Sequence, residues 1–209
     1  MTNISNRHAI SVIIFFMTFF IFLNCGTGIV PSPDPGIIKV TLQADPADTL
    51  IVITGDTLTT VPGDSFHVKI YQGKAFTNDS TFAILYQNTS EYYEVEHNYN
   101  LFKREDDIYK EYTIFQSFLP PDNYSKIEFA INSEFLLLTR GFAYGGIGIP
   151  MEIPPESSPF IEFPVNFKID ENSITEIKIE IRPLQSVIRY KDLFHFEPDL
   201  EVRSVSNPY

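Results

Sequence analysis

The chain has 209 residues, and its 27 Asp and Glu side chains outnumber 15 Lys and Arg, giving a formal net charge of −12. This acidic balance argues against nucleic-acid binding, which draws its affinity from Lys and Arg contacts to phosphates, and against charge-driven docking on anionic lipid. The single cysteine excludes an internal disulfide, and 19 Phe and 11 Tyr without any Trp favour β-strands.

The first 24 residues have the organisation of a secretory signal. Arg7 precedes an apolar run from Ala9 to Leu23, and a positive start followed by a short apolar core is typical of such signals. The run is shorter than the about 20 apolar residues that a membrane-spanning helix needs. We therefore expect residues 1–24 to form a signal helix that is removed on export.

Cys25 lies just beyond this apolar run. The segment Phe22-Leu23-Asn24-Cys25-Gly26 resembles the lipobox of bacterial lipoproteins, in which the cysteine becomes the lipidated N-terminus. The resemblance implies that Cys25 is the lipid attachment point, that residues 25–36 form a Pro/Gly tether, and that the outer membrane is favoured, because no aspartate follows the cysteine. Two alternatives are ordinary signal cleavage near Gly26 or Gly28 and an uncleaved N-terminal anchor.

Beyond the tether, apolar residues alternate with polar ones in many short segments: 38–42, 66–70, 127–131, 161–169 and 177–181. This period of two is typical of strands with one buried face, and turn residues separate the runs at short intervals. The pattern predicts an all-β fold, namely a single antiparallel β-sandwich of prealbumin or immunoglobulin type over residues 37–203, followed by a tail at 204–209. Pro164 within a strand predicts an edge strand or a bulge.

The segment 91–111 interrupts the alternation and is rich in tyrosine and charge, so we expect a long hairpin or projecting loop. Aromatic rings with polar neighbours anchor protein partners or stack on sugars. The candidate partner-binding residues are Tyr92, Tyr93, Tyr99 and Tyr109. The alternative is that these tyrosines are ordinary strand residues that pack their rings.

Motifs for chemistry are sparse. His67, His97 and His195 lie far apart, so no metal site is predicted. Acidic turn residues such as Asp45 and Asp48 lack the spacing of a calcium loop and are expected to be solvated. The sequence offers no nucleophile motif and no phosphate-binding loop, so we expect no cofactor and no catalytic residues.

The C-terminal half carries three further motifs. Leu119–Ile127 forms a Leu-Pro-x-x-x-Tyr turn into a strand, Phe163–Ile169 and Ile174–Ile181 read as a hairpin, and Ser186–Tyr190 with Phe196–Val202 reads as a closing pair. These segments resemble a family of bacterial envelope lipoproteins of unknown function with a prealbumin-like (transthyretin-like) β-sandwich. The resemblance implies that fold and an envelope location, and it carries over no catalytic residues.

Together these observations predict a lipid-anchored bacterial cell-envelope protein whose domain lies in the periplasm or at the cell surface. We expect it to be a non-catalytic binding or structural module rather than an enzyme. Its expected partners are the membrane, through the lipid, and an envelope polymer or protein; nucleic acid is not expected. The alternative function is an envelope glycan hydrolase, which would need a concave pocket holding paired carboxylates.

Overall fold

The computed structural model describes residues 32–53, 55–87, 98–139, 146–152, 154 and 157–207 of the chain. The predicted signal helix and Cys25 lie outside these residues, as does the tether up to Pro31. The part from Pro33 onward forms one compact unit. It is built of strands alone, which confirms the all-β class for the described residues. None of the described residues belongs to a helix long and apolar enough to cross a membrane.

One of the two large sheets has four strands in the order β16-β13-β1-β9. Its strands are β1 (Gly36–Ala44), β9 (Tyr112–Leu119), β13 (Ile174–Ile181) and β16 (Leu200–Ser206). The sheet thus joins the first described strand to the last. The described strands extend slightly beyond the predicted domain limits of 37 and 203. β1 begins one residue earlier, at Gly36, and β16 continues to Ser206 in the expected tail.

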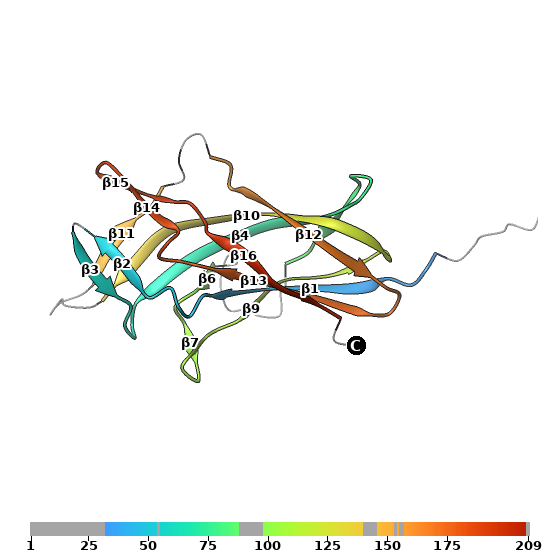
Figure 1. Ribbon diagram of the computed structural model, residues 1–209, viewed down its shortest axis with the longest axis horizontal. Helices are drawn as coiled ribbons and strands as arrows, with labels where there is room; N and C mark the ends of the chain where they lie inside the picture. Colours follow the sequence, from blue (N-terminus) through green and yellow to red (C-terminus); the bar gives the residue numbers. More distant parts are fainter. Residues whose placement is uncertain are drawn as a thin grey trace, which may run out of the picture. The chain divides into compact units, whose positions relative to one another are not determined.

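The second large sheet has six strands, and its main path runs β11-β10-β4-β5. The longest strands, β4 (Ser65–Thr77) and β10 (Asp122–Leu138), run side by side at its centre (Figure 1). Around them lie β5 (Phe82–Leu85), β6 (Asn98–Asn100), β11 (Ile147–Pro150) and β12 (Phe160–Ile169). Both β11 and β12 pair with β10, whereas β5 and β6 pair with β4.

Three two-stranded ribbons complete the described fold. They are β2 (Leu50–Ile53) with β3 (Asp56–Thr59), β7 (Arg104–Glu105) with β8 (Ile108–Tyr109), and β14 (Val187–Tyr190) with β15 (Leu193–Phe196). The β7–β8 ribbon lies in the segment for which a hairpin or projecting loop was expected.

The hydrophobic core lies between the two large sheets. Ile38, Val40 and Leu42 of β1 are fully buried, as the alternation predicted, and they share one cluster with the inner residues of β4, β10 and β12. The sheets meet where Phe115 of β9 packs edge-on against Phe129 of β10, with ring centroids 5.7 Å apart. The architecture is therefore sandwich-like, with the inner faces of two sheets sharing one core.

A seam of hydrogen bonds also joins the two sheets along one side. The Tyr86 backbone carbonyl, just after β5, accepts a 3.0 Å bond from the Gln116 amide of β9, and Gln87 forms a bridge with Phe115. Gly73 of β4 leaves room for the Phe115 ring beside this seam, because a Cβ at that position would lie 2.9 Å from the ring.

One pairing differs from the predicted antiparallel sandwich. β1 and β13 are parallel, with Ile37 opposite Ile174 and Ala44 opposite Ile181, while the other strand pairs are antiparallel. Parallel neighbours need a long connection. Here most of the domain lies between β1 and β13 in the sequence. The alternation within each strand predicts its buried face but not the direction in which the two strands run.

The expected hairpin of residues 163–169 and 174–181 is also wrong. These residues lie in β12 and β13, which belong to different sheets, so the turn at 170–173 carries the chain across the core. Asn172 adopts a φ of 54° in that turn, and Thr175 Oγ1 donates a 2.9 Å bond to the Lys168 carbonyl. Both strands bury alternate residues against the same core. The sequence pattern is therefore the same whether the two strands pair with each other or lie in opposite sheets.

Pro164 occupies the position that its chemistry requires. It lies on β12, which pairs with β10, and it stands opposite Lys126 beside a register shift in the β10 ladder. A proline has no N–H to donate to a ladder, so it is tolerated on an edge strand next to a bulge. The prediction of an edge strand or bulge for Pro164 is confirmed.

Tyr124 fixes the turn that enters β10. Its hydroxyl donates a 3.0 Å bond to the Pro120 carbonyl, and its ring stacks on Phe167 with centroids 5.1 Å apart. Burial, with a smaller contribution from Asp122, raises the pKa of this hydroxyl, so it keeps its proton for donation. The same device, a tyrosine bonded to backbone a few residues upstream, stabilises corners in other β-sandwiches.

We expect Tyr124→Phe to lower the free energy of unfolding by about 1 kcal/mol, because the ring contact survives while the Pro120 carbonyl loses its donor. Equilibrium urea unfolding measures this difference. Tyr124→Ala should cost more, since it also removes the stacked ring. An unfolding free energy of Tyr124→Phe equal to that of the wild type would show that the hydroxyl does not stabilise the turn.

Candidate functional site

The tyrosines predicted to bind a partner do not form an exposed cluster in the described part of the chain. Tyr92 and Tyr93 lie outside the described residues. Tyr99 and Tyr109 are only 5% and 4% exposed. The expectation that these two face a partner is thereby corrected, and the alternative interpretation, in which their rings pack in the core, applies to them.

Neighbouring aromatic rings explain this burial. Tyr99 on β6 meets Tyr112 edge-on with centroids 5.2 Å apart, and Tyr109 on β8 lies 6.0 Å from Phe102. The hydroxyl of Tyr112 donates a 2.9 Å bond to the Asn100 carbonyl, which satisfies its polar atom inside the core. Tyr99, Phe102 and Tyr109, the described aromatic residues of this segment, therefore cover one part of the core instead of presenting a surface.

The described histidines are separate from each other. His67 on β4 lies 3.2 Å from the Asn98 side chain, His195 is buried on β15, and His97 is not described. Across the described ranges, no group of three or more His, Cys, Asp or Glu side chains is placed to hold a metal ion.

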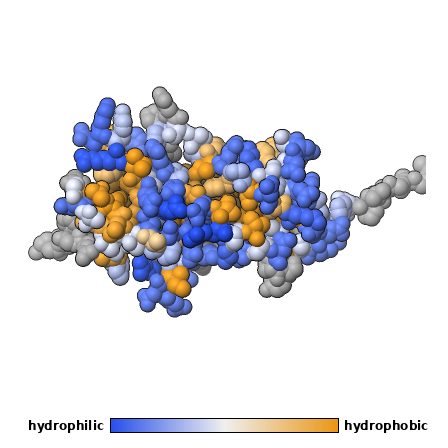
Figure 2. All heavy atoms as spheres, viewed as in Figure 1, coloured by the Kyte–Doolittle hydropathy of each residue, from blue (hydrophilic) through white to orange (hydrophobic). Residues whose placement is uncertain are grey.

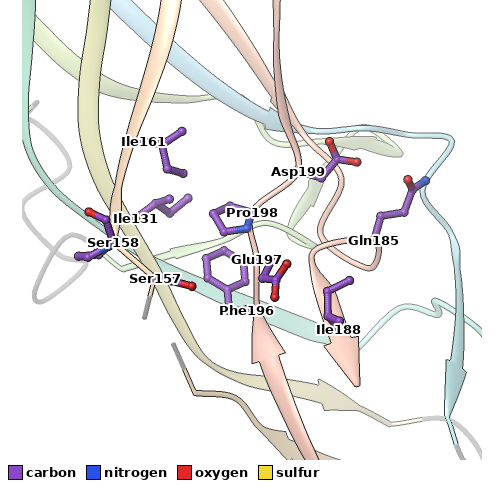
Figure 3. Close-up of a pocket in the computed structure, with 11 residues that line it drawn as sticks. Ile131, Ser157, Ser158, Ile161, Gln185, Ile188, Phe196, Glu197, Pro198 and Asp199 are labelled. Carbon is purple, nitrogen blue, oxygen red and sulfur yellow. The ribbon is translucent and has the colours of Figure 1, made fainter. Parts of the chain in front are cut away.

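Described residues form a hollow of about 600 Å³ beside the start of β12 (Figure 3). Residues from β10, β12 and the β14–β16 region surround it, so segments far apart in the sequence build its walls. Ligand-binding cavities commonly have volumes of about 300–1,000 Å³. The hollow is therefore of a size to take a small ligand or the side chains of a partner.

The hollow is lined by apolar residues, which we call its floor, and by polar residues, which we call its rim. The floor contains Ile131, Ile161, Pro159, Ile188, Phe196 and Pro198. The rim contains Ser157, Ser158, Gln185, Glu197 and Asp199. Figure 3 shows the Phe196 ring beside Pro198, with the Glu197 carboxylate close by. Among the described residues, the lining includes two carboxylates but neither Lys nor Arg, so the rim is rich in hydrogen-bond acceptors and attracts positive charge.

A buried aspartate supports one wall of the hollow. Asp48 is 4% exposed, and its carboxylate accepts bonds from the backbone amides of Leu184 at 2.6 Å and Gln185 at 3.4 Å. The next residue, Ser186, donates its hydroxyl to the Arg182 carbonyl at 2.7 Å and accepts from the Asp199 amide at 2.9 Å. These bonds fix the turn that carries Gln185 and the strand segment that carries Asp199.

Arg182 joins the surrounding acids. Its guanidinium lies 3.0 Å from an Asp199 oxygen, 2.6 Å from Glu201 and 3.4 Å from Asp45. Asp199 is therefore already paired with a cation, whereas Glu197 is exposed to solvent at the rim. Glu197 is the carboxylate with more freedom to meet a ligand.

Sequence reasoning missed this site. Ser157–Pro159 and Glu197–Asp199 are about 40 residues apart and neither is a motif. Asp48 was expected to be a solvated turn charge, and the structure buries it instead. No local sequence pattern indicates the burial of Asp48, because the amides that it binds belong to residues 184 and 185, on a turn far away in the sequence.

Comparisons with known proteins add no relative. No protein-family model matches this chain, and neither a curated protein nor a solved structure shows significant similarity to it.

The pKa of Asp48 is raised above its ordinary value of 3.8, first by burial and then by the nearby charges of Asp45 and Asp199, against the lowering effect of its two amide bonds. A raised pKa in the folded state means that the protonated form contributes stability. This contribution is complete below about pH 3.8 and is lost as the pH rises through the folded-state value.

Asp48→Asn keeps an acceptor for the Leu184 amide without the charge. We therefore expect the unfolding free energy of this variant, relative to wild type, to increase from pH 3 toward neutral pH. Chemical unfolding of both proteins across this range measures the difference. A difference that is constant or falls with pH would contradict the raised pKa.

Proposed function

We propose that this chain is an exported, lipid-anchored, non-catalytic binding module of a bacterial cell envelope, with a single β-sandwich as its body. The observation that carries the binding role is the hollow beside β12, whose apolar floor and acceptor-rich rim have the make-up of a ligand site. Its floor and rim come from elements held by the core and by Asp48, so the site is pre-formed.

The anchor is proposed from the sequence. Cys25 follows a signal-like apolar run, and acylation of this residue would hold the domain at the membrane through several acyl chains, where one chain alone binds only marginally. The first described strand begins at Gly36. A short segment therefore separates the proposed lipid from the folded body. Gly26, in place of an aspartate after Cys25, favours the outer membrane, with the domain in the periplasm or at the cell surface.

The lining of the hollow indicates the chemistry of its ligand. An apolar group would displace water from Ile131, Ile161 and Ile188, and a positive charge or several hydrogen-bond donors would meet Glu197 at the rim. The ligand class is therefore an apolar group joined to a cation, such as an amine or a basic side chain of an envelope protein.

A glycan hydrolase is the competing function, because the hollow does contain two acids. Such an enzyme needs one carboxyl group that stays protonated, which calls for apolar surroundings. Glu197 is instead exposed, and Arg182 lies 3.0 Å from Asp199. These surroundings favour binding over hydrolysis.

We expect Cys25→Ala to move the protein from the membrane fraction to the soluble fraction of its host. Mass analysis of the membrane-extracted wild-type protein should find an N-terminus at Cys25 that carries acyl chains. An intact Met1, or an N-terminus after Gly28, would contradict lipidation without bearing on the hollow.

For the hollow, we expect hexylammonium to cause saturable NMR shifts at residues of the floor and rim, and neutral hexanol to bind several-fold more weakly. Glu197→Gln should remove most of this preference, since one exposed charge pair contributes up to about 1 kcal/mol. Ile188→Ala should weaken both probes, because it removes part of the floor.

Leu50→Ala provides the matched control, because this side chain is 58% exposed on the β2–β3 ribbon, outside the hollow. Equal binding of the two probes would contradict the proposed ligand class. The hydrolase would become the better proposal if the wild type releases reducing ends from an envelope glycan and Glu197→Gln does not.

A further inference from the structure

The outer face of the six-stranded sheet differs from an ordinary solvated surface. Scattered exposed apolar residues are normal in proteins, and Figure 2 shows them in separate patches between hydrophilic groups. On this sheet, aromatic rings and charges instead lie next to each other across adjacent strands. We call this set the aromatic face, and it consists of Lys74, Phe76, Phe82, Lys126, Glu128, Phe160 and Glu162.

Strand register arranges the aromatic face in rows. In one row, Phe82 of β5 stands opposite Phe76 of β4, which stands opposite Lys126 of β10. In the next row, Lys74 of β4 stands opposite Glu128 of β10, which stands opposite Glu162 of β12. Side chains in such rows point to the same side of the sheet, so they form one continuous surface.

Cations hold the rings of this face in place. Lys74 Nζ lies 5.5 Å from the ring centroid of Phe82 and 5.7 Å from that of Phe160, so it bridges two rings on different strands. Lys126 Nζ lies 4.3 Å from the Phe76 centroid, within the usual range of a cation–π contact. Phe82 and Phe160 nevertheless stay 55% and 47% exposed, so each ring keeps surface that a ligand can contact.

The charges of the aromatic face are balanced. Lys74 pairs with Glu128 at 3.0 Å, and Lys126 pairs with Glu162 at 2.9 Å. Two cations and two anions give a net charge of zero, in a chain whose formal charge is −12. The surface therefore attracts neither polyanions nor polycations by charge, yet it offers both donors and acceptors.

A second hollow, of about 420 Å³, lies in the aromatic face. Lys74, Glu128, Ser158, Phe160 and Glu162 line it, so an aromatic wall stands beside one ammonium group and two carboxylates. A sugar ring has a face of C–H groups and a rim of hydroxyls that both donate and accept. The C–H face fits the Phe160 ring, and the hydroxyls fit the charged groups.

We propose that the aromatic face binds a neutral polysaccharide, with Phe82 and Phe160 as stacking platforms and the Lys74–Glu128 pair as the hydrogen-bonding centre. This site adjoins the hollow of Figure 3, with which it shares Ser158, but its proposed ligand is neutral and not cationic, so it does not depend on that proposal. Together with a lipid anchor, it would attach an envelope polymer to the membrane.

Affinity gel electrophoresis with dextran, laminarin and galactomannan tests this proposal on the domain within its full chain. We expect at least one of these neutral polymers to retard the wild type, equally at low salt and at about 0.5 M NaCl, because no net charge is involved. Phe82→Ala and Phe160→Ala should each weaken the retardation at least about threefold, since each removes one stacked ring.

The control variant is Phe118→Ala. Phe118 is 71% exposed on β9 of the other sheet, so its loss removes a similar exposed ring without touching the aromatic face. Unchanged thermal unfolding of all three variants would show that their folds are intact. The proposal is overturned if none of the three polymers retards the wild type, if polygalacturonate retards it more strongly, or if Phe118→Ala has the same effect as the two face variants.

Discussion

Burial of alternating apolar side chains between the two large sheets is the interaction on which every other feature of this domain depends. Phe115, Phe129 and Phe163 form a continuous aromatic path from β9 through β10 to β12, with centroids 5.7 and 5.3 Å apart. Each buried aromatic side chain contributes about 1.5–3 kcal/mol. Because strands alternate with a period of two, fixing the inner face also fixes the outer one. The ion pairs and exposed rings outside are placed by the core residues inside.

That same alternation explains what the sequence alone could predict. The segments around Ile38 and Phe129 were correctly expected to be strands with one buried face, and Pro164 was correctly expected at an edge or bulge. These are local properties, since each depends only on near neighbours. The parallel direction of β1 and β13 and the passage from β12 to β13 across the core are not local. Both follow from how distant strands share the core, and no period in the sequence encodes that choice.

The same contrast between local and non-local properties applies to the candidate binding residues. Tyr99 and Tyr109 lie in a segment whose composition is typical of a recognition surface, yet neighbouring rings bury them. Composition cannot distinguish a tyrosine on a binding surface from one in the core. The hollow beside β12 brings together Ser158 and Glu197, whose separation in the chain hid their proximity. Asp48 is the sharpest case, because a residue that resembles any acidic turn residue supports a wall of that hollow through the amides of a distant turn.

The seam between β5 and β9 has a consequence for motion. The Tyr86 carbonyl and the Gln116 amide tie the sheets together on one side, and the Phe115 ring fills the space that Gly73 leaves. β9 pairs with β1 on one side and bonds to the residues just after β5 on the other, so releasing β9 breaks contacts to both sheets. Although they belong to different sheets, β5 and β9 are therefore coupled in local opening. The sandwich-like body is held together along this side, so local opening is easier at strands away from the seam.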